Sequence, residues 1–136
     1  IDHLDELYQL SEILATEDLK ARVALRINMD TGVYPLWDRF GFNYENGSAW
    51  TAVTKVMAQP RMELVGLHCH IGTYMLSAQA YAIASHKLCD LADEIRKQYQ
   101  RRIEYLDLGG GFASGNTLKG SYLQGTDVIP SMDYYA

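Results

Sequence analysis

The sequence predicts an α/β fold and, more narrowly, part of a (β/α)8 barrel. Helix-like and strand-like segments alternate in short units, which is typical of parallel strands joined by crossover helices. The strand-like segments are apolar on one face, and the other face turns polar only toward their C-terminal ends. Barrel strands show this pattern because their inward positions build a site at the C-terminal rim. A barrel needs about 250 residues, so three strands represent under half of one.

The first helix is expected to begin at Asp2, a residue type that caps helices. Its apolar positions recur at helical spacing: Leu4, Leu7, Leu10 and Leu14. A strand follows at residues 22–28, "RVALRIN", which is short and rich in branched side chains. After a long loop at residues 29–47, a second helix is expected to end before Pro60. Its apolar positions are Trp50, Val53, Val56 and Met57.

The second half of the chain repeats this alternation. A strand is expected at residues 62–71, "MELVGLHCHI", and Ser77 is expected to be the N-cap of a long helix. The apolar stripe of that helix is Tyr81, Ala84, Leu88, Leu91 and Ile95. The third strand, "IEYLDL" at residues 103–108, runs into three glycines.

Alternation along the first two strands predicts which face meets the helices. The apolar set expected to pack on the helices is Val23, Leu25, Ile27, Val65, Leu67, Cys69 and Ile71. The opposite set is Ala24, Arg26, Asn28, Gly66, His68 and His70. Asp107, near the end of the third strand, continues the trend toward polar residues at the rim.

Charge and composition exclude some partners. The net charge of -5 with scattered Lys and Arg argues against nucleic-acid binding. No apolar segment approaches the roughly 20 residues that cross a bilayer. Cys69 and Cys89 have no framework spacing, so a reduced, cytoplasmic protein is expected. The chain starts at Ile1 and ends in "GSYLQGTDVIPSMDYYA" without an evident closing element, so we expect a piece of a longer protein.

The run "LDLGGGF" ends in Gly109, Gly110 and Gly111. Successive glycines leave backbone N–H groups free to converge on an anion, as in phosphate-binding nests, although a triple glycine is also a common flexible turn. The dinucleotide fingerprint would require a glycine at position 114, where Ser114 stands.

His68 and His70 share a strand face because of the two-residue period. Such a pair could begin a zinc site, but a metal hydrolase needs further ligands from other strands. The remaining histidines, His3 and His86, fall in predicted helices. Within this chain, the metal hypothesis therefore lacks partners.

Four ordered segments carry a family resemblance: "RIN" (26–28), "RFGF" (39–42), "LVGLHCHIGT" (64–73) and "LDLGGGF" (106–112). Together they resemble the fold-type III pyridoxal-phosphate-dependent amino acid decarboxylases, among which the diaminopimelate decarboxylases are most similar, with ornithine and arginine decarboxylases as relatives. The resemblance covers most of the chain through Phe112. It implies that residues 1–136 are the central portion of an alanine-racemase-like barrel that binds pyridoxal 5'-phosphate.

The resemblance also implies roles for individual residues. His70 would lie flat against the pyridoxal ring, and Thr73 would offer its hydroxyl to the cofactor phosphate. Gly109, Gly110 and Gly111 would give backbone N–H groups to the same phosphate. Arg26 matches an arginine that reaches toward the cofactor from its strand, whereas His68 is expected to have a structural role inside the barrel.

Several parts of such an enzyme are expected to lie outside this chain. The lysine that binds the cofactor belongs to an early strand, and none of Lys20, Lys55, Lys87, Lys97 and Lys119 stands in its sequence context. The resemblance further implies a later acidic residue, a C-terminal β-domain and a homodimer with shared active sites. The parent would therefore act on a small-molecule amino acid, while the chain alone would be inactive.

Three alternatives remain at this point. The segment "DTGVYPLWDRFGF" also resembles a loop of amino acid racemases that depend on the same cofactor. A metal-dependent hydrolase could use His68 and His70, and an inactive relative could bind a partner protein. The substrate is expected to be diaminopimelate or another basic amino acid, by resemblance only. The stretch "VYPLW" (33–37) could be a lid or a packed loop.

Overall fold

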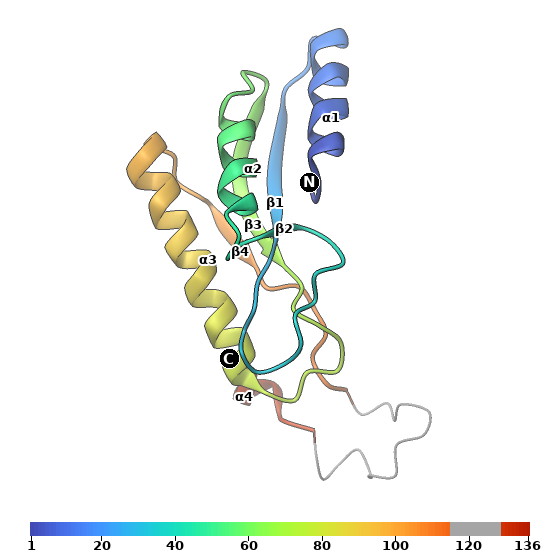
Figure 1. The fold of residues 1–136 in the computed structure, drawn as a ribbon, viewed down its shortest axis with the longest axis vertical. Coiled ribbons are helices and arrows are strands. Elements are labelled where there is room, and N and C mark those ends of the chain that lie inside the picture. The colour runs from blue at the N-terminus through green and yellow to red at the C-terminus, as the bar shows by residue number, and fades with distance from the viewer. Residues whose placement is uncertain (115–128) are drawn as a thin grey trace.

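The computed structural model describes residues 1–114 and 129–136. Helices and strands alternate along this part of the chain, except that two strands, β1 and β2, follow each other (Figure 1). In order they are α1 (Leu4–Thr16), β1 (Ala21–Asn28), β2 (Phe42–Asn43), α2 (Ser48–Met57), β3 (Met62–Cys69), α3 (Ala78–Tyr99), β4 (Tyr105–Asp107) and α4 (Met132–Tyr135).

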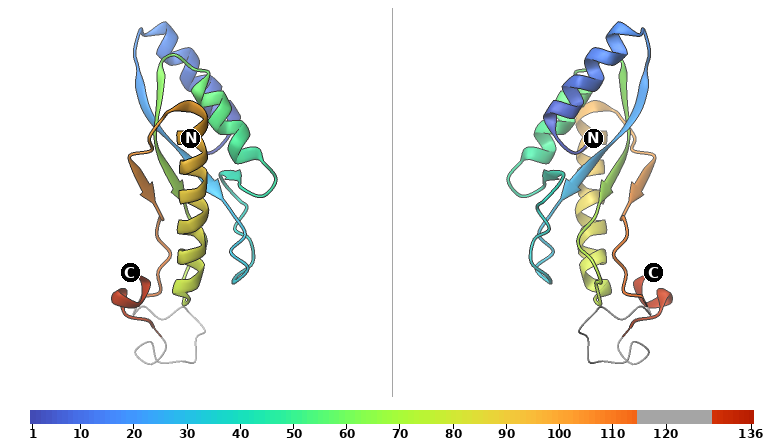
Figure 2. Two further views of the ribbon diagram at one scale, coloured as in Figure 1. Left: turned by 90° about the vertical axis from the view of Figure 1, so that its left-hand side faces the viewer. Right: turned by 90° about the vertical axis from the view of Figure 1, so that its right-hand side faces the viewer.

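All four strands belong to one parallel sheet in the order β2-β1-β3-β4. Helices α1, α2 and α3 form a layer on one face of it (Figures 1 and 2). In the described residues, no helix covers the opposite face. A doubly wound sheet carries helices on both faces, whereas barrel strands carry them on the outside only. The one-sided cover agrees with the predicted barrel-like arrangement.

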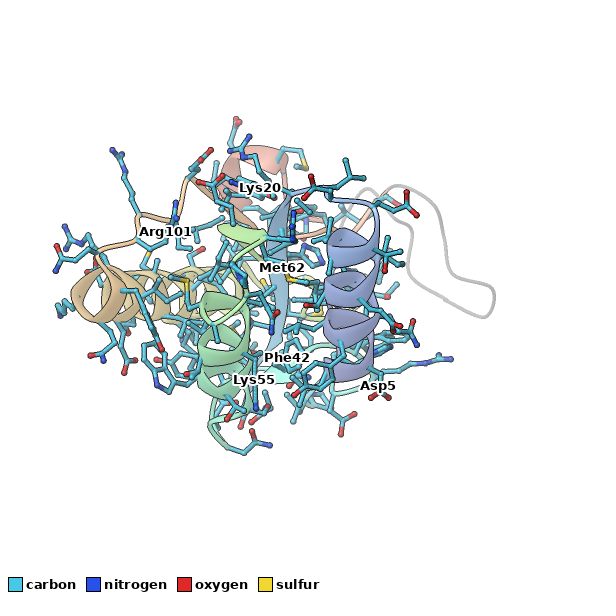
Figure 3. All side chains as sticks on the ribbon, turned by 90° about the horizontal axis from the view of Figure 1, so that it is seen from above. Asp5, Lys20, Phe42, Lys55, Met62 and Arg101 are labelled. Atoms are coloured by element: carbon cyan, nitrogen blue, oxygen red, sulfur yellow. The ribbon has the colours of Figure 1, made fainter. Side chains whose placement is uncertain are left out.

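The core lies between the sheet and this helical layer. Figure 3 views it from the end where the strands begin, with Lys20, Met62 and Arg101 labelled near the starts of β1, β3 and β4. All five stripe residues of α3 are buried there, together with Leu7 and Leu14 of α1 and Val53 and Val56 of α2. The other predicted stripe residues, Leu4, Leu10, Trp50 and Met57, are partly buried and pack against this core. On β1, the helix-facing residues are Val23, Leu25 and Ile27, as predicted.

The prediction for β3 is wrong at one residue. Leu67, Cys69 and Ile71 join the core cluster, but Val65 does not, although it is buried. The pairing with β1 shifts by one residue between Val23 and Ala24, so Leu64 takes the position opposite Val23. An extra residue in one strand reverses which side chains face the helices before it.

Other boundaries also differ from the expectations. The N-cap of α1 is His3 rather than Asp2, because His3 Nδ1 accepts the backbone N–H of Glu6 at 3.0 Å. Ser77 does stand at the N-cap of α3, but its side chain makes no capping hydrogen bond. Strand β4 is shorter than predicted, and the last residues include the short helix α4 rather than only irregular structure. Residues 115–128, with Lys119, lie outside the described part.

Strand β2 was not predicted, and Asn28 explains how it forms. The amide nitrogen of this buried side chain donates to the carbonyls of Phe40 and Gly41, at 3.0 and 2.9 Å. Its amide oxygen accepts from the side chain of Asn43 at 2.9 Å. Asn28 thereby ties the end of the long loop to the end of β1, where β2 pairs with it.

No described helix is both long and apolar enough to cross a membrane.

We expect Asn28→Asp to lower the free energy of unfolding of the complete protein by about 3 kcal/mol. The substitution replaces the donor with an oxygen that faces two carbonyls in a buried place. Urea unfolding measures the effect. The matched control is Asn46→Asp, because exposed Asn46 uses only its oxygen, which accepts the backbone N–H of Ser48. Equal losses in the two variants would contradict this role for Asn28.

Candidate functional site

The candidate site lies at the end of the sheet where the strands finish. Three loops meet there: the β1–β2 loop (29–41), the β3–α3 loop (70–77) and the glycine loop (108–113) that follows β4. In Figure 2 they leave the same end of the sheet. Because all strands are parallel, their C-terminal residues converge at this rim, which is where barrel enzymes build their sites.

The β3–α3 loop and the glycine loop touch backbone to backbone. A Cβ at Gly111 would overlap the carbonyl oxygen of Gly72, and a Cβ at Gly109 would overlap that of Cys69. Both glycines also have positive φ, +90° and +70°. Met75 N–H donates to the Gly111 carbonyl at 2.8 Å, which holds the loops in register. Gly109 and Gly111 are therefore required by space as well as by conformation.

Hydrogen bonds fix the glycine loop at three places. The N–H of Gly109 donates to Asp107 Oδ1 at 2.8 Å, the Gly110 carbonyl accepts from the hydroxyl of Tyr81 at 3.1 Å, and the Gly111 carbonyl accepts from Met75. Among the described residues, the N–H groups of Gly110 and Gly111 donate to nothing. A Cβ at Gly110 would meet only open space. Two backbone donors therefore remain for an anion at this turn.

His70 stands half-buried beside the glycine loop. A Cβ at Gly111 would lie 3.5 Å from His70 Cε1. The ring meets Trp37 of the β1–β2 loop edge-on, with centroids 6.1 Å apart and planes at 75°. Burial lowers the pKa of His70 below its usual 6.5, and the charges of Arg26 and His68 lower it further. The neutral imidazole is therefore favoured, and an uncharged ring is suited to stacking on a flat heterocycle.

Arg26, His68 and Asp107 lie in register across β1, β3 and β4 on the face without helices. His68 Nδ1 is 3.1 Å from Asp107 Oδ2, although without hydrogen-bond geometry. The guanidinium of Arg26 lies over the ring of Phe40, 5.0 Å from its centroid. This row lies one two-residue repeat farther from the C-terminal rim than His70, since His68 precedes His70 by two residues along the strand.

A pocket of about 240 Å³ opens beside Thr73. Its walls come from the β1–β2 loop and the β3–α3 loop: Tyr34, Pro35, Trp37, Ile71, Gly72, Thr73 and Met75. The hydroxyl of Tyr34 accepts the backbone N–H of Leu76 at 3.0 Å, so the two loops are joined. Tyr34, Pro35 and Trp37 of the stretch 33–37 thus line the pocket, and Leu36 and Trp37 are also exposed to solvent.

The pair His68 and His70 does not form a metal centre in the described residues, where no three His, Cys, Asp or Glu side chains could hold an ion together. Cys69 points to the opposite face and is buried in the core. Burial raises the pKa of its thiol to about 12, so it is not a thiolate ligand at neutral pH.

The structure brings His70, Gly111 and the backbone beside Thr73 together, with Arg26 on the same face of the sheet. Sequence reasoning missed the bonds that hold the loop. Asp107 precedes Gly109 by two residues, a spacing at which an aspartate often bonds the backbone of a turn. Tyr81 was expected only as a core residue, but a buried tyrosine hydroxyl needs a partner.

A comparison with known families agrees with this geometry. The profile of the family described as "Pyridoxal-dependent decarboxylase, pyridoxal binding domain" matches residues 1–131. The chain belongs to this family. Membership implies pyridoxal phosphate as the cofactor, and the racemase and the metal hydrolase are not favoured.

Curated relatives within the family are diaminopimelate decarboxylases. The enzyme of Actinosynnema pretiosum subsp. auranticum is 36% identical over 120 residues, which are 83% of this chain and 26% of that protein. The enzyme of Bacillus subtilis is 32% identical over 91 residues, 67% of this chain and 21% of that protein. The chain thus spans about a quarter of the length of these relatives.

Solved structures of the family show the same fold. Diaminopimelate decarboxylase from M. jannaschii superposes with a TM-score of 0.80 at 25% identity, over 99% of this chain and 31% of that chain. A structure of that enzyme with L-lysine gives a TM-score of 0.76 at 25% identity, over 94% of this chain and 31% of that one. These decarboxylases are barrel proteins, so the sheet and helices described above are part of such a barrel.

We expect Gly111→Ala to lower the free energy of unfolding of the complete protein by about 2 kcal/mol or more, because the methyl group would meet the Gly72 carbonyl at a positive φ. Thermal unfolding measures the loss. Gly110→Ala is the matched control, since open space surrounds that position. An unfolding temperature for Gly111→Ala equal to that of Gly110→Ala would contradict the close approach of the two loops.

We expect Arg26→Gln to raise the pKa of His70 in the cofactor-free protein, because one positive charge near the imidazole is removed. In the wild-type protein, the lowered pKa favours the neutral ring. His70 therefore contributes stability above pH 6.5, and this stability is lost as the pH falls through the pKa of His70 in the folded state. An NMR titration of the His70 ring protons measures the change. Arg96→Gln, at the far end of α3, serves as the control. An unchanged titration in Arg26→Gln would refute the coupling.

Proposed function

We propose that the complete protein containing this chain is a pyridoxal-phosphate-dependent amino acid decarboxylase. The observation that carries the proposal is the contact between the glycine loop and the β3–α3 loop, which sets a two-donor turn beside His70 in a chain of the pyridoxal-binding family. Diaminopimelate, or another basic amino acid, is the proposed substrate, in keeping with the names of the relatives.

The described residues fit a phosphorylated, planar cofactor. Glycines at 109 and 111 leave no room for side chains, and the N–H groups of Gly110 and Gly111 are free among the described residues. Backbone donors without side chains are suited to a phosphate dianion. The exposed hydroxyl of Thr73 follows directly on Gly72, which contacts Gly111. Phosphate would thus be held by Gly110, Gly111 and Thr73, while Gly109 shapes the turn with its N–H on Asp107.

His70 and Arg26 are the proposed partners of the ring. A neutral imidazole can stack on a flat ring without the cost of burying a charge, and the edge of Trp37 restrains its tilt. Stacking would shield one face of the ring from water. Arg26 offers a permanent positive charge on the same sheet face, where Phe40 holds its guanidinium. When bound, pyridoxal phosphate supplies the electron sink for the pair released as the carboxylate bond breaks.

We further propose that residues 1–136 are the middle of the barrel. The chain covers 31% of the length of the solved relative from M. jannaschii. The cofactor-binding lysine, the acid for the pyridine nitrogen and a C-terminal β-domain would lie in other parts of the protein. A cytoplasmic homodimer with shared active sites belongs to the same proposal, and sedimentation of the complete protein tests the dimer.

The first test is the absorption spectrum of the complete protein purified with pyridoxal phosphate, before and after borohydride. We expect a visible band that borohydride removes. Protein that has not been treated with borohydride is then incubated with meso-diaminopimelate, L-lysine, L-ornithine or L-arginine, and the release of CO2 is measured. Diaminopimelate is expected to release CO2 fastest.

Each other outcome contradicts part of the proposal. Inversion of the amino acid without CO2 would make the protein a racemase. A colourless protein with stoichiometric zinc would support the hydrolase, with His68 and His70 as ligands. A protein that binds neither group would be an inactive relative. Faster release of CO2 from ornithine or arginine than from diaminopimelate would contradict only the proposed substrate.

A further inference from the structure

Tyr81 joins helix α3 to the glycine loop. Its side chain is 2% exposed, and its ring stacks on Phe112 with centroids 4.6 Å apart and planes at 17°. Tyr135 meets the same ring edge-on, with centroids 5.7 Å apart. Packing alone would be served by phenylalanine. The buried hydroxyl instead finds the Gly110 carbonyl at 3.1 Å, which offsets its desolvation.

This hydrogen bond determines where a neighbouring donor points. The described part contains no cis peptide bond. In a trans peptide unit the carbonyl of one residue and the N–H of the next point in opposite directions. The Gly110 carbonyl points to α3, so the N–H of Gly111 points away from α3. The next unit is held in the same manner, since the Gly111 carbonyl accepts from Met75.

We propose that Tyr81 is a positioning residue for the phosphate of the cofactor: by holding the Gly110 carbonyl, its hydroxyl keeps the Gly111 N–H directed at the anion. This inference rests on the proposed function. Glycine has wide backbone freedom, and a loop of three glycines would otherwise lose much entropy on ordering around a ligand. A turn fixed before binding avoids that loss at the moment of binding.

The hydroxyl remains a donor under physiological conditions. Burial, followed by weaker effects of nearby groups that include Tyr135, raises the pKa of Tyr81 to about 12. The phenol is therefore protonated throughout the neutral range. A carbonyl partner can only accept, so the proton must point to Gly110.

The test compares pyridoxal phosphate with pyridoxal, which lacks the phosphate. Both are titrated by fluorescence into the cofactor-free complete protein, as wild type and as Tyr81→Phe. We expect Tyr81→Phe to weaken the binding of pyridoxal phosphate about five-fold, which is the effect of losing one hydrogen bond. Pyridoxal should bind both proteins equally. Phosphorus-31 NMR of the bound cofactor should show a changed phosphate resonance in the variant.

Tyr135→Phe is the matched control. It removes another hydroxyl of the same aromatic cluster, one that donates to the Met75 carbonyl at 2.6 Å and not to a glycine. Its preference for the phosphorylated form should equal that of wild type. Tyr81→Phe keeps the stack on Phe112, so it is expected to fold, and thermal unfolding checks both variants.

The outcomes separate the two proposals. If wild type strongly prefers pyridoxal phosphate over pyridoxal and Tyr81→Phe keeps the same preference, the positioning role of Tyr81 is wrong, while the proposed function stands. Equal weakening of pyridoxal and pyridoxal phosphate would also overturn that role, because the effect would then be general packing. A wild-type protein that binds neither form, or shows no preference for the phosphorylated one, would contradict the proposed function itself.

Discussion

The close approach of the β3–α3 loop to the glycine loop is the constraint on which the site depends. Gly111 lies against the Gly72 carbonyl and Gly109 against that of Cys69, so neither position admits a side chain. The bond between Met75 N–H and the Gly111 carbonyl fixes the relative height of the two loops. Because β3 and β4 are parallel neighbours, their exits meet at one rim and this contact becomes possible. His70 and Thr73, on one of the two loops, are thereby placed beside the donors of the other.

The fold, and the meeting of the candidate residues at one rim of the sheet, could be predicted from the sequence because periodicity and strand-end chemistry are local signals. The stripe of α3 and the helix-facing residues of β1 are buried as predicted. Strand β2 was missed because its pairing with β1 depends on a contact between residues distant in sequence, the hydrogen bond of Asn28 to the loop that contains Phe40. The extra residue near Val65 was missed because a strand with apolar residues on both faces gives no signal of a register shift.

The site residues show a similar division. The glycines and His70 can be picked out in the sequence because three successive glycines and a closely spaced histidine pair each follow an apolar, strand-like segment. The bonds that aim them are not visible, since Tyr81 lies 29 residues before Gly110 and has the spacing of an ordinary core residue. Such a residue can be recognised only when the partner of its hydroxyl is known. The same holds for Tyr34, whose hydroxyl joins two loops through Leu76.

The two histidines of "HCHIG" have separate surroundings despite sharing a face. His70 rises to the rim, where it meets Trp37 and the Gly111 backbone, whereas His68 stays in the row with Arg26 and Asp107. Asp107 uses one carboxylate oxygen for the Gly109 N–H and turns the other toward His68. The Asp107 carboxylate therefore links the helix-free face of the sheet to the glycine turn. Its Oδ1 accepts the Gly109 N–H, which would otherwise be a third free donor at the turn. The number of backbone donors left free at the glycine turn, where we propose that the cofactor phosphate binds, thus depends on Asp107 as well as on the glycines themselves.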